Sequence, residues 1–246
     1  MAQNSQRQGT HIKFSIVIPA YNEEGVLGPT LLSLKRLGTL RREFEVIVVD
    51  NNSVDHTSEV ARKYGADKVV IEKQPGTNFA REAGRKVARG DIIVFLDADT
   101  TPGMDWLSRI EEDLSRKGVV AVSGPYDHGF TGIRRFLDMA YTTYFLPIVP
   151  KILRILFWRK AGVLIGGNFA AYAWALEKIG GLPPLKFYGD DVAIAMLLSR
   201  HVGKVFFDPG LRIKSSPRRF ETEGFLSTAL KYISSYLKIY FSEDYR

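Results

Sequence analysis

The sequence of 246 residues contains no cysteine. Its absence excludes disulfide bonds, cysteine-ligated zinc, iron–sulfur clusters and thiol catalysis. It also fits an intracellular protein, and we expect a cytoplasmic location. The polar residues 1–11 lack the apolar stretch of a signal peptide, so we predict a flexible tail there. With 45% apolar and 25% charged residues, the chain has the composition of an ordinary folded domain.

Long uncharged apolar runs are also missing. Residues 131–160 have apolar side chains at helical spacing, but lysines and arginines interrupt them, and Pro147 and Pro150 break the segment in two. Neither piece approaches the roughly 18 to 20 uncharged residues of a transmembrane helix. A basic, aromatic-rich segment of this kind is typical of a helix lying in the membrane interface. The alternative is a surface helix that packs its apolar face on the core.

The net charge of +7 is local. It is −1 over residues 1–130, +5 over 131–160, 0 over 161–210 and +3 over 211–246. Such an excess suits nucleic acid, an anionic membrane or a phosphorylated substrate. Because no nucleic-acid-binding motif is present, we expect no nucleic-acid partner but peripheral contact with an anionic membrane surface, on its cytoplasmic face. A weaker apolar stripe over 225–241 predicts a C-terminal helix within 221–246 that docks on the domain or forms a dimer face.

The first half alternates short apolar runs with helical patterns. Strands are predicted over 14–19, 44–49, 68–71 and 91–96, and helices over 23–37, 53–64 and 78–88. This order predicts an α/β fold with a mainly parallel, Rossmann-like sheet flanked by helices. Ligands of such sheets bind beyond the carboxyl ends of the strands. The polar residues at those ends are therefore the candidate site.

Glycine-rich phosphate loops are absent from these strand ends. No G-x-G-x-x-G follows the first strand and no Walker sequence occurs, which disfavours dinucleotide and P-loop enzymes. Asp97 and Asp99 instead follow the last of the predicted strands. Two carboxylates at this spacing suit a hard divalent cation that neutralises a diphosphate. The alternative is that they cap a turn.

Four stretches resemble, in order and spacing, the motifs of family 2 inverting glycosyltransferases of the GT-A fold. They are Ile16–Glu23 (IVIPAYNE), Val48–Thr57 (VVDNNSVDHT), Gly76–Gly90 and Phe95–Asp99 (FLDAD). Weaker similarity through 166–171, 177–181 and 188–191 extends the resemblance to about residues 12–220. It implies a GT-A domain over 12–220, with a nucleotide-binding half (12–130), the basic amphipathic segment (131–160) and an acceptor and base half (161–220), followed by C-terminal amphipathic helices.

The resemblance also implies roles for single residues. The donor would be a nucleoside diphosphate sugar, UDP- or GDP-linked, bound with Mg²⁺ or Mn²⁺. Asp50 would read the nucleobase, Asp97 would contact the ribose and the metal, and Asp99 would ligate the metal. The remaining donor contacts implied in this half are Pro19, Ala20, Tyr21, Glu23, Gly76 and Arg81.

Two later motifs complete the predicted reaction. The acidic pair Asp190 and Asp191 matches the position of the general base, with Asp191 preferred, although Asp residues also cap helices. Arg218 and Arg219 resemble a basic motif over the leaving diphosphate; the alternative is solvated surface arginines. The chain departs from the family pattern at Tyr172, Ala173, Trp174 and Ala193.

The acceptor is the least constrained prediction. The basic segment 131–160 lies between the metal motif and the proposed base, so we prefer a lipid-linked acceptor such as polyprenyl phosphate. A soluble saccharide acceptor is one alternative. A second, suggested by the departures from the family pattern, is a protein that binds nucleotide sugars without turning them over.

Overall fold

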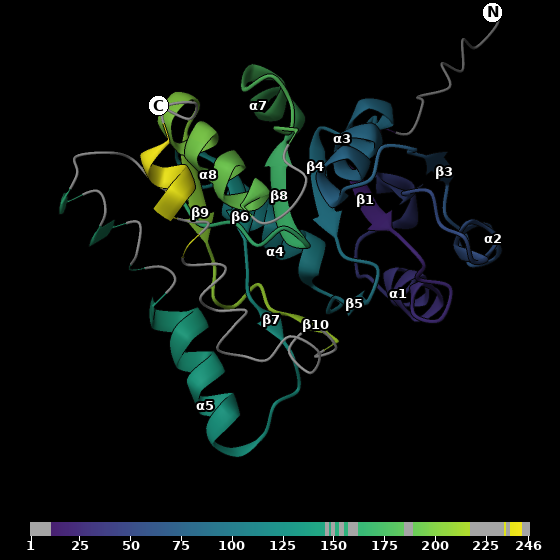
Figure 1. Cartoon of the computed structure of the whole chain (residues 1–246), viewed down its shortest axis with the longest axis horizontal. Coiled ribbons are helices and arrows are strands. Elements are labelled where there is room, and N and C mark those ends of the chain that lie inside the picture. Colours follow the sequence, from purple (N-terminus) through teal and green to yellow (C-terminus); the bar gives the residue numbers. More distant parts are fainter. Residues whose placement is uncertain are drawn as a thin grey trace, which may run out of the picture.

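The computed structural model describes residues 11–145, 148, 151–152, 155–156, 162–184, 189–216, 234 and 237–242. A sheet runs through the centre of the described part (Figure 1). Its seven strands are, in order across the sheet, β3 (Lys68–Ile71), β2 (Phe44–Asp50), β1 (Phe14–Ala20), β4 (Ile92–Leu96), β8 (Asn168–Tyr172), β6 (Val119–Ser123) and β9 (Lys204–Phe207). The four strands predicted in the first half are confirmed, and they pair in parallel.

The central strands are apolar throughout because helices cover both faces of the sheet. All seven residues of β1 are buried, and so are all seven of β2. Alternate residues of β1 face opposite ways: Ile16 and Ile18 join one core cluster, and Val17 joins the other. The fold therefore has three layers with the sheet in the middle, as predicted.

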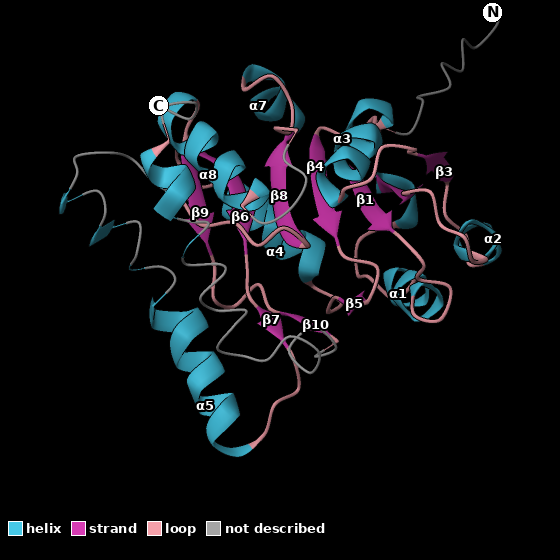
Figure 2. Ribbon diagram, viewed as in Figure 1, coloured by secondary structure: helices cyan, strands magenta, loops and turns pink. Residues whose placement is uncertain are grey.

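The helices divide between these two clusters (Figures 1 and 2). The first face packs against α1 (Leu27–Leu34), α2 (Thr57–Lys63) and α4 (Trp106–Leu114). The second packs against α3 (Thr77–Val87), α7 (Ala173–Lys178) and α8 (Asp190–His201). The helices α1 and α2 are shorter than predicted because residues 21–26 and 51–56, at the strand ends, form turns.

The predicted parallel order ends at β8. This strand pairs antiparallel with both β4 and β6, so the residue that opens it, Asn168, lies opposite Leu96 at the carboxyl end of β4. Below the main sheet, β5 (Thr100–Thr101), β10 (Ile213–Ser215) and β7 (Tyr126–Asp127) form a small second sheet (Figure 2). A short 3-10 helix, η1 (Arg41–Glu43), precedes β2.

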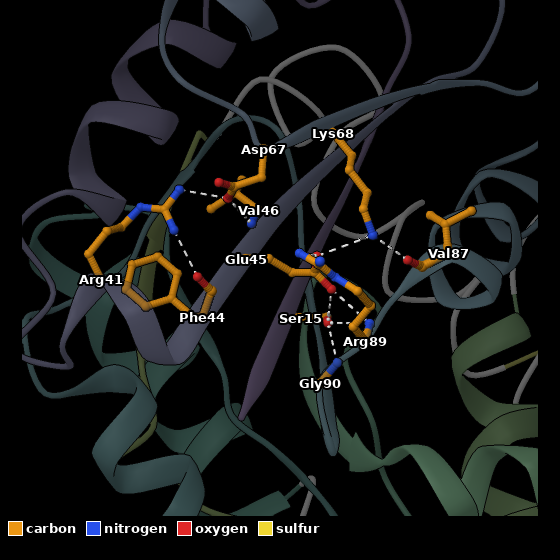
Figure 3. Close-up of polar contacts among 10 residues, drawn as sticks. All are labelled: Ser15, Arg41, Phe44, Glu45, Val46, Asp67, Lys68, Val87, Arg89 and Gly90. Atoms are coloured by element: carbon orange, nitrogen blue, oxygen red, sulfur yellow. Dashed lines mark hydrogen bonds and ion pairs between the residues drawn. The ribbon is translucent and has the colours of Figure 1, made fainter. Parts of the chain in front are cut away.

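A buried carboxylate anchors the far end of α3 to the sheet (Figure 3). Glu45 accepts hydrogen bonds from the hydroxyl of Ser15 at 2.8 Å and from the backbone and guanidinium of Arg89, and Lys68 lies 3.2 Å away. Burial opposes ionisation, but these hydrogen bonds outweigh it and lower the pKa of Glu45. Because Arg89 follows the last turn of α3, this cluster fixes how the helix lies on the sheet.

The basic segment begins with α5 (Gly132–Ala140) and continues as a π-helical turn, η2 (Tyr141–Phe145). In Figure 1, α5 extends away from the central sheet. Its apolar side chains Ile133, Phe136 and Leu137 are 51–71% exposed, so they do not pack on the core as the alternative expectation required. Within the described residues, no helix has the length and apolar character to cross a membrane.

The C-terminal segment docks on α8. Tyr240 is fully buried and packs with Val192 and Met196, and the guanidinium of Arg200 lies 5.5 Å from its ring. Tyr240 therefore places the described end of this segment against α8, while Leu237 and Phe241 are exposed. Most of the helix predicted over 221–246, the tail 1–10, and both Arg218 and Arg219 lie outside the described residues.

Candidate active site

Side chains hold together the two loops that follow β1 and β2. The backbone N–H of Asn22 donates to Ser53 Oγ at 3.0 Å, and that of Glu23 donates to Thr57 Oγ1 at 2.8 Å. In return, Asn22 Oδ1 accepts from the N–H of Val54 at 2.9 Å. Asn22 has a φ of 53°, a conformation that asparagine tolerates better than most residues. The first predicted donor loop is therefore fixed against the second.

Asp50 lies where these loops meet. Its side chain is buried; Oδ1 accepts from the N–H of Ser53 at 2.8 Å and Oδ2 from the hydroxyl of Ser58 at 2.5 Å. Each carboxylate oxygen has a second lone pair, so a further donor can still bind. Of the other predicted loop residues, Pro19 and Ala20 are buried at the end of β1, and Tyr21 is exposed.

Asn51 is a site residue that the sequence analysis missed. Its amide donates to the carbonyls of Glu72 and Gln74 at 2.9 and 2.7 Å, and its Oδ1 accepts from the N–H of Gly76 at 2.8 Å. Gly76 has a φ of 136°, which favours glycine, and α3 begins at the next residue. Asn51 thus places the start of α3 beside the end of β2. The feature of the sequence that could have identified Asn51 is its position, one residue after a buried strand.

Asp97 and Asp99 lie in the short turn between β4 and β5. The hydroxyl of Thr100 donates to the carbonyl of Asp97 at 2.7 Å and closes the turn. Neither aspartate caps a helix, since α4 begins only at Trp106. Both oxygens of Asp97 are engaged: Oδ1 accepts from Arg81 at 3.1 Å and Oδ2 from the hydroxyl of Tyr126 at 2.7 Å.

Arg81 joins the two acidic motifs. It projects from α3, its side chain is only 6% exposed, and its Nη1 donates to Asp190 Oδ2 at 2.8 Å while Nη2 donates to Asp97. Burial disfavours the charged form, but the negative charges of Asp190 and Asp97 outweigh it and raise the pKa of Arg81. Both terminal nitrogens thus contact carboxylates, so a direct contact with the donor would compete with one of them.

The acidic pair lies inside α8 and occupies its first turn. The N–H of Val192 donates to Asp191 Oδ1 at 2.8 Å, and the N–H of Gly166 also hydrogen-bonds this carboxylate. These donors and Arg81 favour ionisation, yet burial and the charge of Asp190 outweigh them and raise the pKa of Asp191 to about 7. Burial, and then the charge of Asp191, raise the pKa of the Tyr141 phenol in η2.

A second group of residues missed from the sequence completes the network. The hydroxyl of Tyr126 accepts from the N–H of Gly167 at 3.0 Å while donating to Asp97. A Cβ on Gly166 would lie 2.8 Å from Arg81 Nη1, and one on Gly167 would lie 2.0 Å from Asp97 Cγ. Only glycines fit this close approach of backbone to side chain. In the sequence, Gly166 and Gly167 carry only the weak family similarity of residues 166–171, which assigns them no role.

The carboxylates at this edge suit a Mg²⁺ or Mn²⁺ ion that is shared with a diphosphate. Among the described residues no cluster of three or more acidic or histidine side chains could enclose a metal by itself. Mg²⁺ commonly takes only one or two protein carboxylates and completes its coordination with water and phosphate oxygens. Asp99 would supply one such carboxylate, and each oxygen of Asp97 has lone pairs beyond the hydrogen bond that it accepts. The described residues therefore fit such an ion.

Two of the departures from the family pattern, Tyr172 and Trp174, lie away from this edge. Tyr172 pairs with Ile92 at the start of β4, the opposite end from Asp97, and its hydroxyl donates to the carbonyl of Leu114. Trp174 stacks on Tyr172 with ring centroids 6.0 Å apart, and Ala193 is buried within α8. The substitutions at Tyr172 and Trp174 therefore leave the described site intact.

Comparison with known proteins identifies a family and related sequences. The family described as glycosyl transferase family 2 matches residues 15–179. The chain is 31% identical over 181 residues to the probable glycosyltransferase YdaM of Bacillus subtilis, which covers 69% of this chain and 42% of that protein. The chain spans less than half the length of the curated relatives it matches first.

Two solved structures share the fold. A mannosyltransferase from Pyrobaculum calidifontis, in complex with GDP-Man and Mn²⁺, has a TM-score of 0.72 and 22% identity, covering 94% of this chain and 64% of that one. Glucosyl-3-phosphoglycerate synthase from Mycobacterium tuberculosis, in complex with Mn²⁺, UDP-glucose and phosphoglyceric acid, has a TM-score of 0.66 and 23% identity, covering 93% and 79%. The mainly parallel sheet with flanking helices is common to all three.

Proposed function

Because the chain belongs to glycosyl transferase family 2, we propose that it transfers one sugar from a nucleoside diphosphate sugar to a hydroxyl or phosphate acceptor, with inversion at the anomeric carbon. The observation that carries this proposal is the position of Arg81. Its guanidinium contacts Asp97 of the D-x-D turn and Asp190 of the acidic pair. A donor-side and an acceptor-side carboxylate, far apart in the sequence, thus share one partner.

The donor would bind over the carboxyl ends of β1, β2 and β4. Asp50 would accept a hydrogen bond from the nucleobase, and the loop with Tyr21 and Glu23 would border the nucleotide. Solved structures of the same fold contain GDP-Man and UDP-glucose with Mn²⁺. Asp99, with Asp97, would hold a Mg²⁺ or Mn²⁺ ion that neutralises charge on the diphosphate.

Asp191 would act as the general base. Its ionised carboxylate would accept the proton of the acceptor hydroxyl as that oxygen bonds to the anomeric carbon and the bond to the diphosphate breaks. A phosphate acceptor needs no such proton transfer when ionised. Burial and the charge of Asp190 raise the pKa of Asp191, and the N–H groups of Val192 and Gly166 oppose that rise. The balance leaves this pKa at about 7.

Arg218 and Arg219 would balance charge on the leaving diphosphate. Both arginines lie outside the described residues. The strand that precedes them in the sequence, β10, is described. Ser215 of β10 pairs with Thr100 of β5, the residue after Asp99. The main chain that continues to Arg218 therefore starts beside the metal-binding turn.

A lipid-linked acceptor is the subclass we favour. On α5 the exposed Arg134 and Arg135 lie between the exposed Ile133 and Phe136. The turn η2 follows directly, and its Tyr141 is near enough to Asp191 for that charge to raise the pKa of the phenol. An anionic bilayer surface complements both the apolar residues and the positive charge of this helix. A polyprenyl phosphate held in that surface would approach Asp191 along η2.

Turnover tests the function against the alternative of binding without catalysis. UDP-, GDP- and dTDP-sugars are screened with and without Mn²⁺ by thermal shift, and transfer is then assayed with polyprenyl phosphate and saccharide acceptors. We expect a Mn²⁺-dependent shift, and activity about 100 to 10,000 times lower in Asp99→Ala and Asp191→Asn. Asp105→Ala, in an exposed turn beyond the site, is the matched control. The proposal would be overturned if none of the nucleotide sugars shifted the melting temperature, or if both variants kept full activity.

A further inference from the structure

Three segments of the chain converge on the guanidinium of Arg81. The residue itself comes from α3, Asp97 from the end of β4, and Asp190 from the first turn of α8. The side chains of Arg81 and Asp190 are 6% and 17% exposed, so their ion pair is largely removed from water. A buried pair of this kind is costly to break, because the partner that remains is left uncompensated.

The rest of the network limits how these groups can move. Asp97 is held from its other side by Tyr126, which in turn binds the N–H of Gly167. The neighbouring Gly166 binds Asp191. Gly166 and Gly167 both lie too close to Arg81 and Asp97 for any larger residue. A closed circuit therefore connects the D-x-D turn with the start of α8.

Arg81 is also anchored from behind. The opposite end of α3 is fixed to β1 and β2 by the Glu45 cluster, and its first residue follows Gly76, which Asn51 holds. The described hydrogen-bond partners of the guanidinium are Asp97 and Asp190, and its Nε is buried without a partner among the described residues. Among the described residues, the guanidinium therefore contacts these two carboxylates and connects them.

We propose that Arg81 is a positioning residue, which fastens the start of α8 to the D-x-D turn and thereby sets the distance between the donor and the base Asp191. The inference rests on the proposed function for its catalytic consequence, but the mechanical connection stands by itself. Loss of Arg81 would free the first turn of α8. It would not remove a group that reacts.

The first test needs no turnover. Hydrogen–deuterium exchange is measured for wild type, Arg81→Met and the conservative Arg81→Lys, with Arg85→Met as the control one turn along α3, where Arg85 pairs with Glu82. We expect faster exchange at residues 190–194 and 166–168 in Arg81→Met, a smaller effect in Arg81→Lys, and none there in Arg85→Met. Unchanged exchange at both segments in Arg81→Met would overturn the proposal. Should Arg81→Met fail to fold, Asp190→Asn, which keeps the size of the side chain, replaces it with the same expected result.

The second test separates positioning from binding. Using the donor found in the screen, we expect kcat about 100-fold lower in Arg81→Met, since displacement of a reacting group by about 1 Å costs that much. The KM for the donor and the affinity for UDP or GDP with Mn²⁺ should change far less. A loss confined to nucleotide affinity would instead make Arg81 a donor ligand and overturn the inference. Absence of turnover in wild type would refute the proposed function, and exchange would still decide the role of Arg81.

Discussion

Gly167 lies directly against Asp97: a Cβ built on this glycine would be 2.0 Å from Asp97 Cγ. The backbone there also binds Tyr126, so the loop cannot move aside without breaking the hydrogen bond of the Gly167 N–H. The D-x-D turn and the loop before β8 therefore have one allowed separation.

Gly167→Ala should be destabilising and should displace Asp97. Overpacking of this kind costs about 1–3 kcal/mol, measured as the free energy of unfolding in urea. We expect transfer activity to fall by more than the loss of folded protein accounts for. The reason is that a displaced Asp97 would also displace Arg81, which is hydrogen-bonded to it. Gly25→Ala is the control, since a Cβ there meets nothing within 4 Å. Equal behaviour of the two variants would contradict the described packing.

Activity should depend on the ionisation of Asp191. Because its pKa is raised to about 7, the carboxylate is largely protonated below that pH and cannot accept a proton. With a hydroxyl acceptor, we expect kcat/KM to fall on acidification below about pH 7. Asp190→Asn removes the neighbouring negative charge and should therefore lower the pKa of Asp191. The fall in kcat/KM should then begin at a lower pH. A profile without an acid limb in this range would exclude Asp191 as the base.

The α5 helix should bind anionic vesicles. We expect co-sedimentation with phosphatidylserine-containing vesicles at low salt, weakened by Phe136→Ser with Leu137→Ser and, separately, by Arg134→Ser with Arg135→Ser. Each arginine near the surface contributes about 1 kcal/mol of binding free energy. Leu40→Ser and Arg42→Ser, exposed elsewhere, are the controls. The membrane proposal fails if wild type does not sediment, or if it sediments equally with neutral vesicles.

Glu45 should contribute stability that acid removes. Its pKa is lowered in the folded state, so its contribution is present above the unfolded value of 4.5 and is lost as pH falls through the folded value. Glu45→Gln should lower the free energy of unfolding by about 1–3 kcal/mol at neutral pH. The difference from wild type should shrink below pH 4.5. Exposed Glu112→Gln should show neither effect, and a constant difference would refute the assignment.

The local alternation of the first half could be predicted because each strand and helix there has its own periodic pattern. Residues 168–172 combine the strand formers Phe169 and Tyr172 with an asparagine and two alanines, so propensity marks β8 only weakly. No local pattern reveals that this strand inserts antiparallel between β4 and β6.

The candidate site was predictable where it follows strand ends, as with Asp50 and Asp97. The ion pairs of Arg81 with Asp97 and Asp190 could not be predicted. These residues are far apart in the sequence, and their pairing depends on how α3 and α8 pack on the sheet. The exposure of α5 was likewise open, since an apolar stripe does not say what covers it.

The excursion of the chain between β6 and β8 is closed at its base. Ser123 Oγ donates to the carbonyl of Asn168 at 2.8 Å, and the N–H of Gly124 donates to the same carbonyl at 3.2 Å. Both ends of the excursion belong to the site, since Tyr126 contacts Asp97 and Gly167 lies against it. Because closing a longer loop costs little additional entropy, the chain between these two ends can lengthen or shorten with small effect on the sheet. On the proposed function, new acceptor preferences could evolve in this middle part while the contacts of Tyr126 and Gly167 with Asp97 are kept.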